Sequence, residues 1–479
     1  MAGSRPLGND PEPGRVRHVL LELIRRKALR ERAPGPVPRG PFLFWLPAGG
    51  PTLIAPRRIP RMNAPEPIQS ENASHGLPFG EFVALMASLM AVNALGIDIM
   101  LPALGRIGSE LGVSVENHQQ LVIAVYIGAF GFGQLVHGPL ADRFGRRPLL
   151  LGTMGIYALM SFIAAHAGSF ELLLVARALQ GFVAASTRVL SISIVRDCYA
   201  GRRMARVTSL CFMVFLAVPI LAPTLGQLVL IVAPWHWIFY LLGAFSLFVA
   251  LWAWLRLPET LAPDRRRSIA LASILDATRT TLRDRLSLGY ALASAVVYGG
   301  LVGFLNSSQQ IFAHSFHAPE LFAPGFAAIA VMMAIAALLN SRIVERLGTR
   351  LVSHSALIAM ILLSLVRLGV VLSGRETVLI FALFQGTTMF LFGLTGSNFS
   401  AMAMERVGHI AGTASSIQGF MQSLIGTLIG IAIGQTFSGT TLPLTLGFLI
   451  GSSAALLIVL VAERGRLFRA HNCRPTTQA

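Results

Sequence analysis

The chain has 479 residues, of which 54% are hydrophobic and only 13% are charged. Together with a mean hydropathy of +0.65, this composition excludes an ordinary soluble globular protein and indicates a polytopic membrane protein. The formal net charge is +17, but the basic residues are distributed as membrane topology requires, and we expect no nucleic-acid partner.

Residues 1–75 are rich in Pro, Gly and Arg, and twelve of the basic residues precede Met62. We expect a disordered, basic cytoplasmic tail, although its amphipathic stretch HVLLELIRRKALRER can also rest on a lipid surface. Met62 begins the run MNAPEP shortly before the first apolar run. It is an alternative translation start, which mass spectrometry of the native N-terminus would test.

Twelve apolar runs follow, each close to the roughly 20 residues that a helix needs to cross the hydrocarbon core. They form six spans in residues 76–257 and six in residues 286–462, separated by a basic cytoplasmic linker at 258–285 and followed by a cytoplasmic tail at 463–479. We therefore predict an all-α membrane protein with twelve transmembrane helices in two six-helix bundles. The predicted spans are 82–104, 117–139, 149–167, 171–194, 207–232, 235–256, 286–311, 321–342, 351–373, 377–403, 410–435 and 441–462.

The basic residues give the orientation. Of the 39 Lys and Arg, 24 lie between or after the spans, and of these only Arg106 and Arg375 fall in odd-numbered loops. The positive-inside rule therefore predicts that both termini and every even-numbered loop face the cytoplasm. We expect a multi-pass membrane protein with this orientation.

Ionisable residues inside the spans are few. Asp98 is the only carboxylate well inside any span, and an acid in the hydrocarbon is a functional candidate by default. At 1.5 Å per residue it lies roughly 9 Å from the periplasmic end of span 1, and Arg177 in span 4 lies at a similar depth, so the two can pair. Arg188 follows on the same face of span 4 and can meet an anionic group of a substrate, Asp98, or water and backbone carbonyls. Arg367, near the periplasmic end of span 9, is expected to snorkel toward the interface.

The loop after span 2 reads GPLADRFGRRPLL, residues 138–150. Gly138 and Gly145 allow close approach and a tight turn, and Asp142 can pair with arginines and with the N-terminus of a neighbouring helix. Alternatively, the arginines of this run act only as topology signals. They are Arg143, Arg146 and Arg147. A fainter echo, NSRIVERLGTR at 340–350, follows span 8 and supports an internal repeat.

Two further groups of residues interrupt the apolar spans. Pro219 and Pro223 each remove a helical hydrogen bond in span 5, and Gly226 completes a weak stretch that either hinges or seals the bundle or is a passive packing kink. In the second half, polar side chains either face a substrate cavity or make contacts between helices. They are Asn306 and Gln309 in span 7 and Gln385 and Asn398 in span 10.

GPLADRFGRRPLL fits the loop signature of the major facilitator superfamily, G-x-L-[small]-D-[basic]-x-G-[basic]-[basic], at every defined position. Other segments resemble the bicyclomycin/chloramphenicol-resistance (Bcr/CflA) branch of drug/proton antiporters, and the resemblance runs from about residue 80 to residue 462. They are NALGIDIMLPAL around Asp98, ARALQGFVAASTR at 176–188, AVPILAPTLGQ at 217–227 and HIAGTASSIQG at 409–419. Gln227 departs from the span-5 motif, where many antiporters have a second glycine. The resemblance implies a multi-pass protein of the bacterial inner membrane.

The resemblance implies roles for individual residues. Asp142, Arg146 and Asp197 correspond to a charge relay that locks the outward-facing state, whereas static ion pairing is the alternative. Spans 1 and 4 line the central cavity in this superfamily, which places Asp98, Arg177 and Gln180 on the path of the substrate.

No P-loop, HExxH, paired CxxC or nucleophile-elbow motif is present, so we expect no enzyme activity, no cofactor and no metal site. The proton gradient then supplies the energy. We predict a proton-coupled multidrug efflux transporter that works by alternating access, with Asp98 carrying the proton and a small amphipathic compound as substrate. The alternatives are an importer of a specific solute with the same fold, or a membrane sensor that transports nothing.

Overall fold

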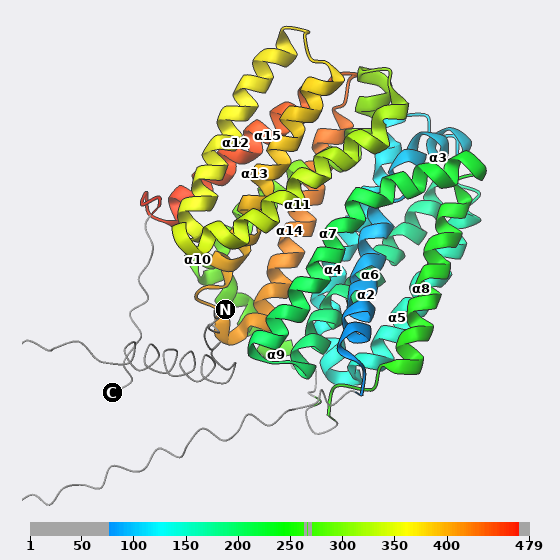
Figure 1. The fold of residues 1–479 in the computed structure, drawn as a ribbon, viewed down its shortest axis with the longest axis vertical. Coiled ribbons are helices and arrows are strands. Elements are labelled where there is room, and N and C mark those ends of the chain that lie inside the picture. Colours follow the sequence, from blue (N-terminus) through cyan, green and yellow to red (C-terminus); the bar gives the residue numbers. More distant parts are fainter. Residues whose placement is uncertain (1–75, 263–265, 267–270, 469–479) are drawn as a thin grey trace, which may run out of the picture. The chain divides into compact units, whose positions relative to one another are not determined.

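The computed structural model describes residues 76–262, 266 and 271–468 (Figure 1). The predicted basic tail with Met62, most of residues 263–270 and the end of the chain after residue 468 lie outside the described residues.

Twelve helices are long and apolar enough to cross a membrane, which confirms the predicted number of spans. The first six are α2 (Phe79–Asp98) continued by η1 (Leu101–Ala103) and α3 (Leu104–Glu110), α4 (Leu121–Phe144), α5 (Arg146–Ala165), α6 (Phe170–Cys198), α7 (Gly201–Val232) and α8 (His236–Arg256). The second six are α10 (Arg285–Gln310), α11 (Phe322–Leu347), α12 (Thr349–Leu372), α13 (Val378–Met404), α14 (Ala411–Gln435) and α15 (Leu442–Ala462). The shorter elements are η2 (Glu116–Gln120), α9 (Leu271–Arg283), η4 (Ile311–Ser315), η5 (Pro319–Leu321) and η6 (Gly408–Ile410).

The two halves repeat one packing scheme. In the first bundle α2 packs against α6, α7 and α8, and α5 packs against α6 and α8; in the second, α10 packs against α13, α14 and α15, and α12 packs against α13 and α15. Each helix of the first half thus has its counterpart six spans later. The bundles meet along α4 with α14 and along α7 with α11, so the predicted pair of six-helix bundles is correct (Figure 1).

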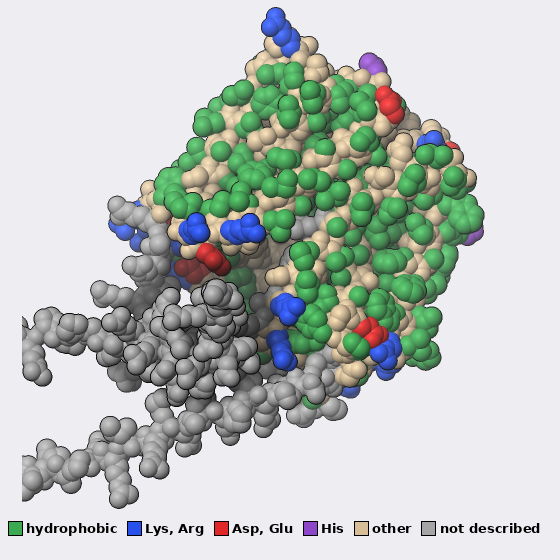
Figure 2. All heavy atoms as spheres, viewed as in Figure 1, with side chains coloured by type: hydrophobic (Ala, Val, Ile, Leu, Met, Phe, Trp, Pro, Cys, Tyr) green, Lys and Arg blue, Asp and Glu red, His purple; other side chains and the backbone are tan. Residues whose placement is uncertain are grey.

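The outside of the bundles is apolar. Figure 2 shows hydrophobic side chains over most of the face in view, with charged side chains gathered toward its ends. Large aliphatic side chains remain exposed on the outer helices, for example Val232 of α7, Leu372 of α12 and Val461 of α15. Because contiguous apolar surface of this extent is unstable in water, it fits a bilayer.

Close helix approach depends on small residues. A Cβ added to Gly181 of α6 would lie 2.2 Å from the carbonyl oxygen of Tyr126 in α4, and one added to Gly133 of α4 would lie 2.2 Å from the carbonyl oxygen of Phe182 in α6. Neither position admits a side chain, as is common where membrane helices touch backbone to backbone. The crossing fixes α6 against α4 and thereby positions the arginines of span 4.

The first span extends further than predicted and is broken. α2 ends at Asp98, and after a turn the chain continues through η1 and α3 to Glu110. Pro102 lacks the N–H that would bond to the carbonyl of Asp98 four residues earlier, and its ring disfavours the preceding helical turn. Asp98 therefore lies at a helix break, and the predicted end of the span at residue 104 was too early.

Candidate functional site

The loop motif joins α4 to α5 at one end of the bundles, which we call the motif end. α4 stops at Phe144, α5 starts at Arg146, and Gly145 between them has φ +102°, a conformation that favours glycine. Arg146 is buried; its Nη1 donates to Asp142 Oδ1 at 2.7 Å and its Nε donates to Asp197 Oδ2 at 3.1 Å. The structure therefore brings together the three charges of the predicted relay.

These three charges belong to one bundle, because Asp142 lies at the end of α4, Arg146 begins α5 and Asp197 lies at the end of α6. Their ion pairs hold helix ends of the first bundle together and do not join the two bundles directly. The motif approaches the second bundle at Gly138, where an added Cβ would lie 3.8 Å from Ser416 Oγ of α14.

Glu259 completes this cluster, although the sequence analysis did not single it out. It follows α8, and its two carboxylate oxygens accept hydrogen bonds from the backbone N–H groups of Arg146 and Arg147 at 2.9 and 3.2 Å. A carboxylate at this position satisfies unpaired amides of α5 and meets the positive end of its dipole. The neighbouring Thr260 Oγ1 donates to Asp197 Oδ2 at 3.4 Å. The sequence signal that could have identified Glu259 is an acidic residue three positions after Arg256, the basic end of span 6.

The two remaining arginines of the motif make other contacts. Arg147 Nη2 donates to the carbonyl oxygen of Trp254 in α8 at 2.5 Å. The guanidinium of Arg143 lies 5.3 Å from the ring centroid of Phe144. Neither makes an ion pair with a carboxylate among the described residues, so Arg146 is the arginine that carries the charge cluster.

The faint echo after span 8 forms an equivalent cluster in the second bundle. Gly348, with φ +82°, separates α11 from α12. Arg350 then donates to Glu405 Oε2 at the end of α13 and to Glu463 Oε1 just after α15, both at 2.8 Å. Glu463 also accepts from the hydroxyl of Tyr290 at 2.6 Å. The repeat is therefore present in the charges at the motif end as well as in the helices.

We expect Arg350→Gln to lower the free energy of unfolding by about 3–5 kcal/mol, the range for breaking one side of a buried ion pair. The side chain of Glu463 is 0% exposed, so it would keep a buried charge without its cation. Chemical unfolding in mixed micelles measures the change. Arg406→Gln is the matched control, because the Arg406 side chain is 54% exposed and lies 3.7 Å from Asp284; it should change stability by less than about 1 kcal/mol. Equal effects would contradict the expectation.

Arg177 is fully buried inside the first bundle. Its Nε donates to the carbonyl oxygen of Val122 at 3.1 Å, its Nη1 to Gln180 Oε1 at 2.7 Å and its Nη2 to the carbonyl oxygen of Gly96 at 2.9 Å. Its guanidinium carbon lies 4.2 Å from the ring centroid of Tyr126, which supplies a cation–π contact. Backbone carbonyls, a carboxamide and a ring thus take the place of a counterion.

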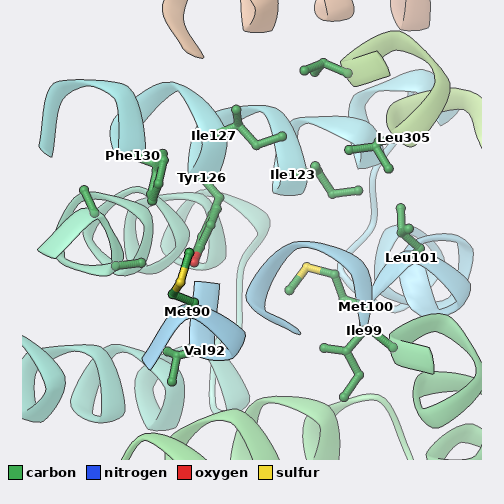
Figure 3. Close-up of a cluster of buried hydrophobic side chains, with 14 of the residues drawn as sticks. Met90, Val92, Ile99, Met100, Leu101, Ile123, Tyr126, Ile127, Phe130 and Leu305 are labelled. Atoms are coloured by element: carbon green, nitrogen blue, oxygen red, sulfur yellow. The ribbon is translucent and has the colours of Figure 1, made fainter. Parts of the chain in front are cut away.

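The predicted ion pair between Asp98 and Arg177 does not form, and Arg177 does not line an open cavity. Gln180 is also fully buried, and its Nε2 donates to Ser161 Oγ of α5 at 2.5 Å. Hydrogen bonds of Arg177 and Gln180 therefore link spans 1 to 4 in this conformation. The surrounding core is apolar: Figure 3 shows Tyr126 reaching from its helix toward Met90.

Asp98 is buried, with 4% of its surface exposed. It makes no hydrogen bond or ion pair with any residue that the structure describes. Its carboxylate lies within electrostatic range of the hydroxyls of Tyr126 in α4 and Tyr298 in α10. An ionised carboxylate without a partner is costly in the hydrocarbon, which makes Asp98 a candidate for reversible protonation.

Arg188 differs from Arg177 although the two share one face of α6. Its side chain is exposed, while Ala184, one turn before it, is fully buried. Within the described part of the chain Arg188 has neither a hydrogen bond nor an ion pair, but it lies within electrostatic range of Tyr298 in the second bundle. Tyr298 was missed by the sequence analysis, since a single tyrosine in an apolar span carries no signal.

The sequence predicted that Arg367 snorkels toward the membrane interface, and this prediction is wrong. It is 2% exposed and forms an ion pair with Glu376, Nε to Oε1, at 3.1 Å. Its Nη1 donates to Gln385 Oε1 at 2.8 Å, and its guanidinium lies 5.0 Å from the ring centroid of Phe381. Gln385, fully buried, therefore serves this pair and does not line a cavity. The sequence signal for this ion pair is Glu376, an acidic residue just after the end of span 9.

The other polar residues of the second half have three different settings. Asn398 and Asn340 exchange hydrogen bonds between α13 and α11 at 2.9 and 3.3 Å, which is the helix–helix alternative. Asn306 is 1% exposed, and neither polar atom of its side chain has a partner among the described residues. Gln309 lines a cavity at the end opposite the motif.

α7 continues as a helix through both Pro219 and Pro223. Its closest approach to span 1 is at Gly226, where an added Cβ would lie 1.9 Å from the carbonyl oxygen of Ile99, just past the helix break after Asp98. Gln227, the departure from the motif, turns into the cavity that Gln309 lines. The close packing of span 5 is therefore retained, because Gly226 makes it.

Uncharged amides close the end opposite the motif, a feature that the sequence analysis missed. Asn117 Nδ2 donates to the carbonyl oxygens of Gln435 and Phe437 at 3.1 and 3.0 Å, and Gln435 Nε2 donates to the carbonyl oxygen of Asn117 at 2.8 Å. Gln310 Nε2 donates to Asn117 Oδ1 at 3.0 Å, and Gln310 Oε1 accepts from Gln120 Nε2. These bonds join the two bundles, and we call the four side chains the amide closure.

A cavity of about 630 Å³ lies at this same end between the bundles. Its lining includes Gly105, Arg106, Gln227, Leu230, Gln309 and Glu320. Arg106 Nη1 donates to the carbonyl oxygen of Leu230 at 3.1 Å. Gln309 of this lining precedes Gln310 of the amide closure, and Asp98 is not among the lining residues.

The arrangement of paired bundles, a charged turn after span 2 and a buried acid in span 1 agrees with comparisons to known proteins. Residues 86–431 match the Major Facilitator Superfamily. The chain belongs to this superfamily. It is 27% identical over 388 residues to the bicyclomycin resistance protein homolog of Haemophilus influenzae, covering 79% of the chain and 94% of that protein. It is 26% identical over 394 residues to the multidrug resistance protein MdtL of Klebsiella pneumoniae, covering 79% of the chain and 95% of that protein.

A solved structure shares the fold. The crystal structure of a D-xylose-proton symporter superposes with a TM-score of 0.62 at 13% identity, covering 81% of this chain and 99% of that one. The predicted superfamily is confirmed, and the names of the relatives are consistent with the bicyclomycin-resistance branch. As a member of this superfamily, the protein is a multi-pass membrane transporter of small molecules and not an enzyme.

Proposed function

We propose that this major facilitator protein is a proton-coupled exporter of small amphipathic compounds, a drug/proton antiporter of the bacterial inner membrane. The observation that carries the proposal is Asp98, a buried acid without a described partner, at a helix break in span 1. A membrane acid of this kind can take up and release a proton at low cost when its surroundings change. The resistance proteins to which the chain is similar support export as the direction.

The proposed orientation has the motif end in the cytoplasm, because the basic residues between the spans gather there. The amide closure then lies on the periplasmic side. With that side closed by hydrogen bonds between the bundles and Arg188 exposed, the conformation is the inward-facing one. Substrate would enter from the cytoplasm and meet the exposed face of span 4.

The coupling follows from a competition for Asp98. In the inward-facing state described above, the acid is buried and favoured in its neutral form, so it would carry a proton. Entry of substrate rearranges and hydrates the region between the bundles, which favours the ionised form and releases the proton to the cytoplasm. After outward opening and release of substrate, Asp98 is protonated from the periplasm, and the bundles return. No nucleotide is needed in this cycle.

The test is accumulation of antibiotics and dyes in a host without its own major exporters, with and without a protonophore. We expect cells that make the protein to accumulate less of at least one compound, and the protonophore to abolish the difference. Purified protein in liposomes should then move protons when that compound is added.

Two alternatives predict different results in the same assays. An importer would raise accumulation of its solute, and its deletion would lower it. A non-transporting sensor would leave accumulation unchanged and would show no proton movement with any compound. Either outcome would overturn the proposed export.

A further inference from the structure

Within the membrane-spanning parts of spans 1 and 4, the exposed charge is positive. Arg188 is exposed, whereas Asp98 is 4% exposed and Arg177 is fully buried. A substrate that reaches this depth in the inward-facing state therefore meets a guanidinium, while the carboxylate of Asp98 is buried. Arg177 is not available for this role, because carbonyls and a carboxamide occupy its donors.

Arg188 faces the second bundle and not the lipid. It lies within electrostatic range of Tyr298 of α10, which belongs to the other bundle. On the same face of α6, the preceding Ala184 and Arg177 are both buried within the first bundle. A side chain that is exposed and yet close to the opposite bundle lies in the space between the two.

Tyr298 is held in a fixed position on the far side of this space. Its ring packs on Gly426 of α14, where an added Cβ would lie 2.5 Å from the tyrosine Cδ1. Its side chain is half-buried, and its hydroxyl is within electrostatic range of both Arg188 and Asp98. The ring thus presents a flat apolar surface and a hydroxyl within electrostatic range of the guanidinium.

We propose that Arg188 and Tyr298 form a recognition pair for substrates in which an anionic group, such as a carboxylate, is attached to an aromatic ring. This inference rests on the proposed export function and names the class of compound that the same site selects. The guanidinium binds the anionic group with charge-assisted hydrogen bonds, and the tyrosine ring packs against the aromatic body. Permanently cationic compounds are disfavoured, because Arg188 repels them and the neutral, buried Asp98 offers no accessible negative charge.

The pair also links recognition to the proton. An anion bound at Arg188 lies near Tyr298, whose hydroxyl is within electrostatic range of Asp98. Binding of an anion at Arg188 therefore changes the electrostatic environment of Asp98, with only the side chain of Tyr298 between them. Neutral compounds can still pack against the ring but gain nothing from the guanidinium, so they serve as the internal reference.

The experiment measures uptake into everted membrane vesicles that contain the full-length protein, energised with a proton gradient. Three probes are used: the anionic dye fluorescein, neutral chloramphenicol and cationic tetraphenylphosphonium. We expect the wild-type protein to transport fluorescein faster than tetraphenylphosphonium. Arg188→Gln should lower fluorescein transport at least about tenfold while changing chloramphenicol transport by less than about threefold. Arg188→Lys, which keeps the charge, should retain most of the fluorescein transport.

Substitutions of the tyrosine separate its two contributions. Tyr298→Phe keeps the ring and should leave chloramphenicol transport near the wild-type rate, whereas Tyr298→Ala should lower transport of both fluorescein and chloramphenicol. Tetraphenylphosphonium transport at or above the fluorescein rate, or equal fluorescein transport in Arg188→Gln and the wild type, would overturn the charge selection and leave export standing. If the wild-type protein transports none of the three probes, the recognition pair fails, whereas the proposed export is decided separately by the accumulation assays.

Discussion

Asp98→Asn should abolish proton-driven export while leaving the protein folded and inserted. Asparagine has nearly the same shape but cannot carry a proton, and no other carboxylate lies well inside a predicted span of this chain. Loss of a group that transfers protons removes about a hundredfold or more of a rate that depends on it. Uptake of an identified substrate into everted vesicles, driven by an imposed pH gradient, measures the effect.

Exchange of substrate across the membrane distinguishes loss of coupling from loss of folding. In counterflow, labelled substrate outside exchanges for unlabelled substrate inside and no proton gradient is used, so Asp98→Asn should retain at least about a third of the wild-type exchange rate. Glu171→Gln is the matched control, since it removes an exposed carboxylate in the first turn of α6 and should leave both assays unchanged. Undiminished uphill transport by Asp98→Asn would refute the assignment of the proton to this residue.

The parts of the structure that sequence reasoning predicted well are those encoded locally. Span number follows from run lengths of apolar residues, and the turn at Gly145 follows from fixed offsets of glycine and charge within one short loop. Asp142 and Arg146 are four residues apart, so their ion pair needed little tertiary information. Asp197, in contrast, was assigned through the resemblance to the major facilitator superfamily, which places the third charge of the relay at the end of span 4.

The partners of the buried arginines were not predictable in the same way. Arg177 is bonded to the carbonyl oxygens of Val122 and Gly96, and a backbone carbonyl has no signature in the sequence. Asp98 was therefore predicted as the partner of Arg177, because it is the only carboxylate at a similar depth in the predicted spans. The amide closure was missed for a related reason, since Asn117 and Gln435 are ordinary polar residues near span ends and become a gate only when the two bundles meet.

Arg177 and Arg367 are both buried, and the difference between their partners explains why Asp98 has no described partner. Arg177 and Arg367 each donate to a glutamine oxygen, at 2.7 and 2.8 Å, and each lies over an aromatic ring. Arg367 also pairs with Glu376, which makes it a closed, static contact of the second bundle. Arg177 uses carbonyls instead, so the acid of the first bundle is not consumed by an ion pair. The asymmetry supports the proposal that the proton carrier lies in the first bundle.

Asn117→Ala should shift the protein toward the conformation that is open on the side of the amide closure. The asparagine side chain makes three of the hydrogen bonds that join the bundles there. At about 0.5–1.5 kcal/mol each, their loss changes the equilibrium between the two conformations by roughly ten- to a thousandfold. Spin labels at Ser109 and Glu320, which are exposed on the two bundles at this end, measure the change as a longer distance between the labels.

Thr436→Val provides the control at the same location, because the Thr436 hydroxyl donates only to carbonyl oxygens of its own helix, those of Ala432 and Ile433. It should leave the distribution of distances unchanged. The two variants together separate bonds that cross between bundles from bonds that do not. If Asn117→Ala and Thr436→Val give the same distances as the wild type, the amides are packing contacts, and the energy that holds this side closed must come from the apolar contacts of α4 with α14 and of α7 with α11.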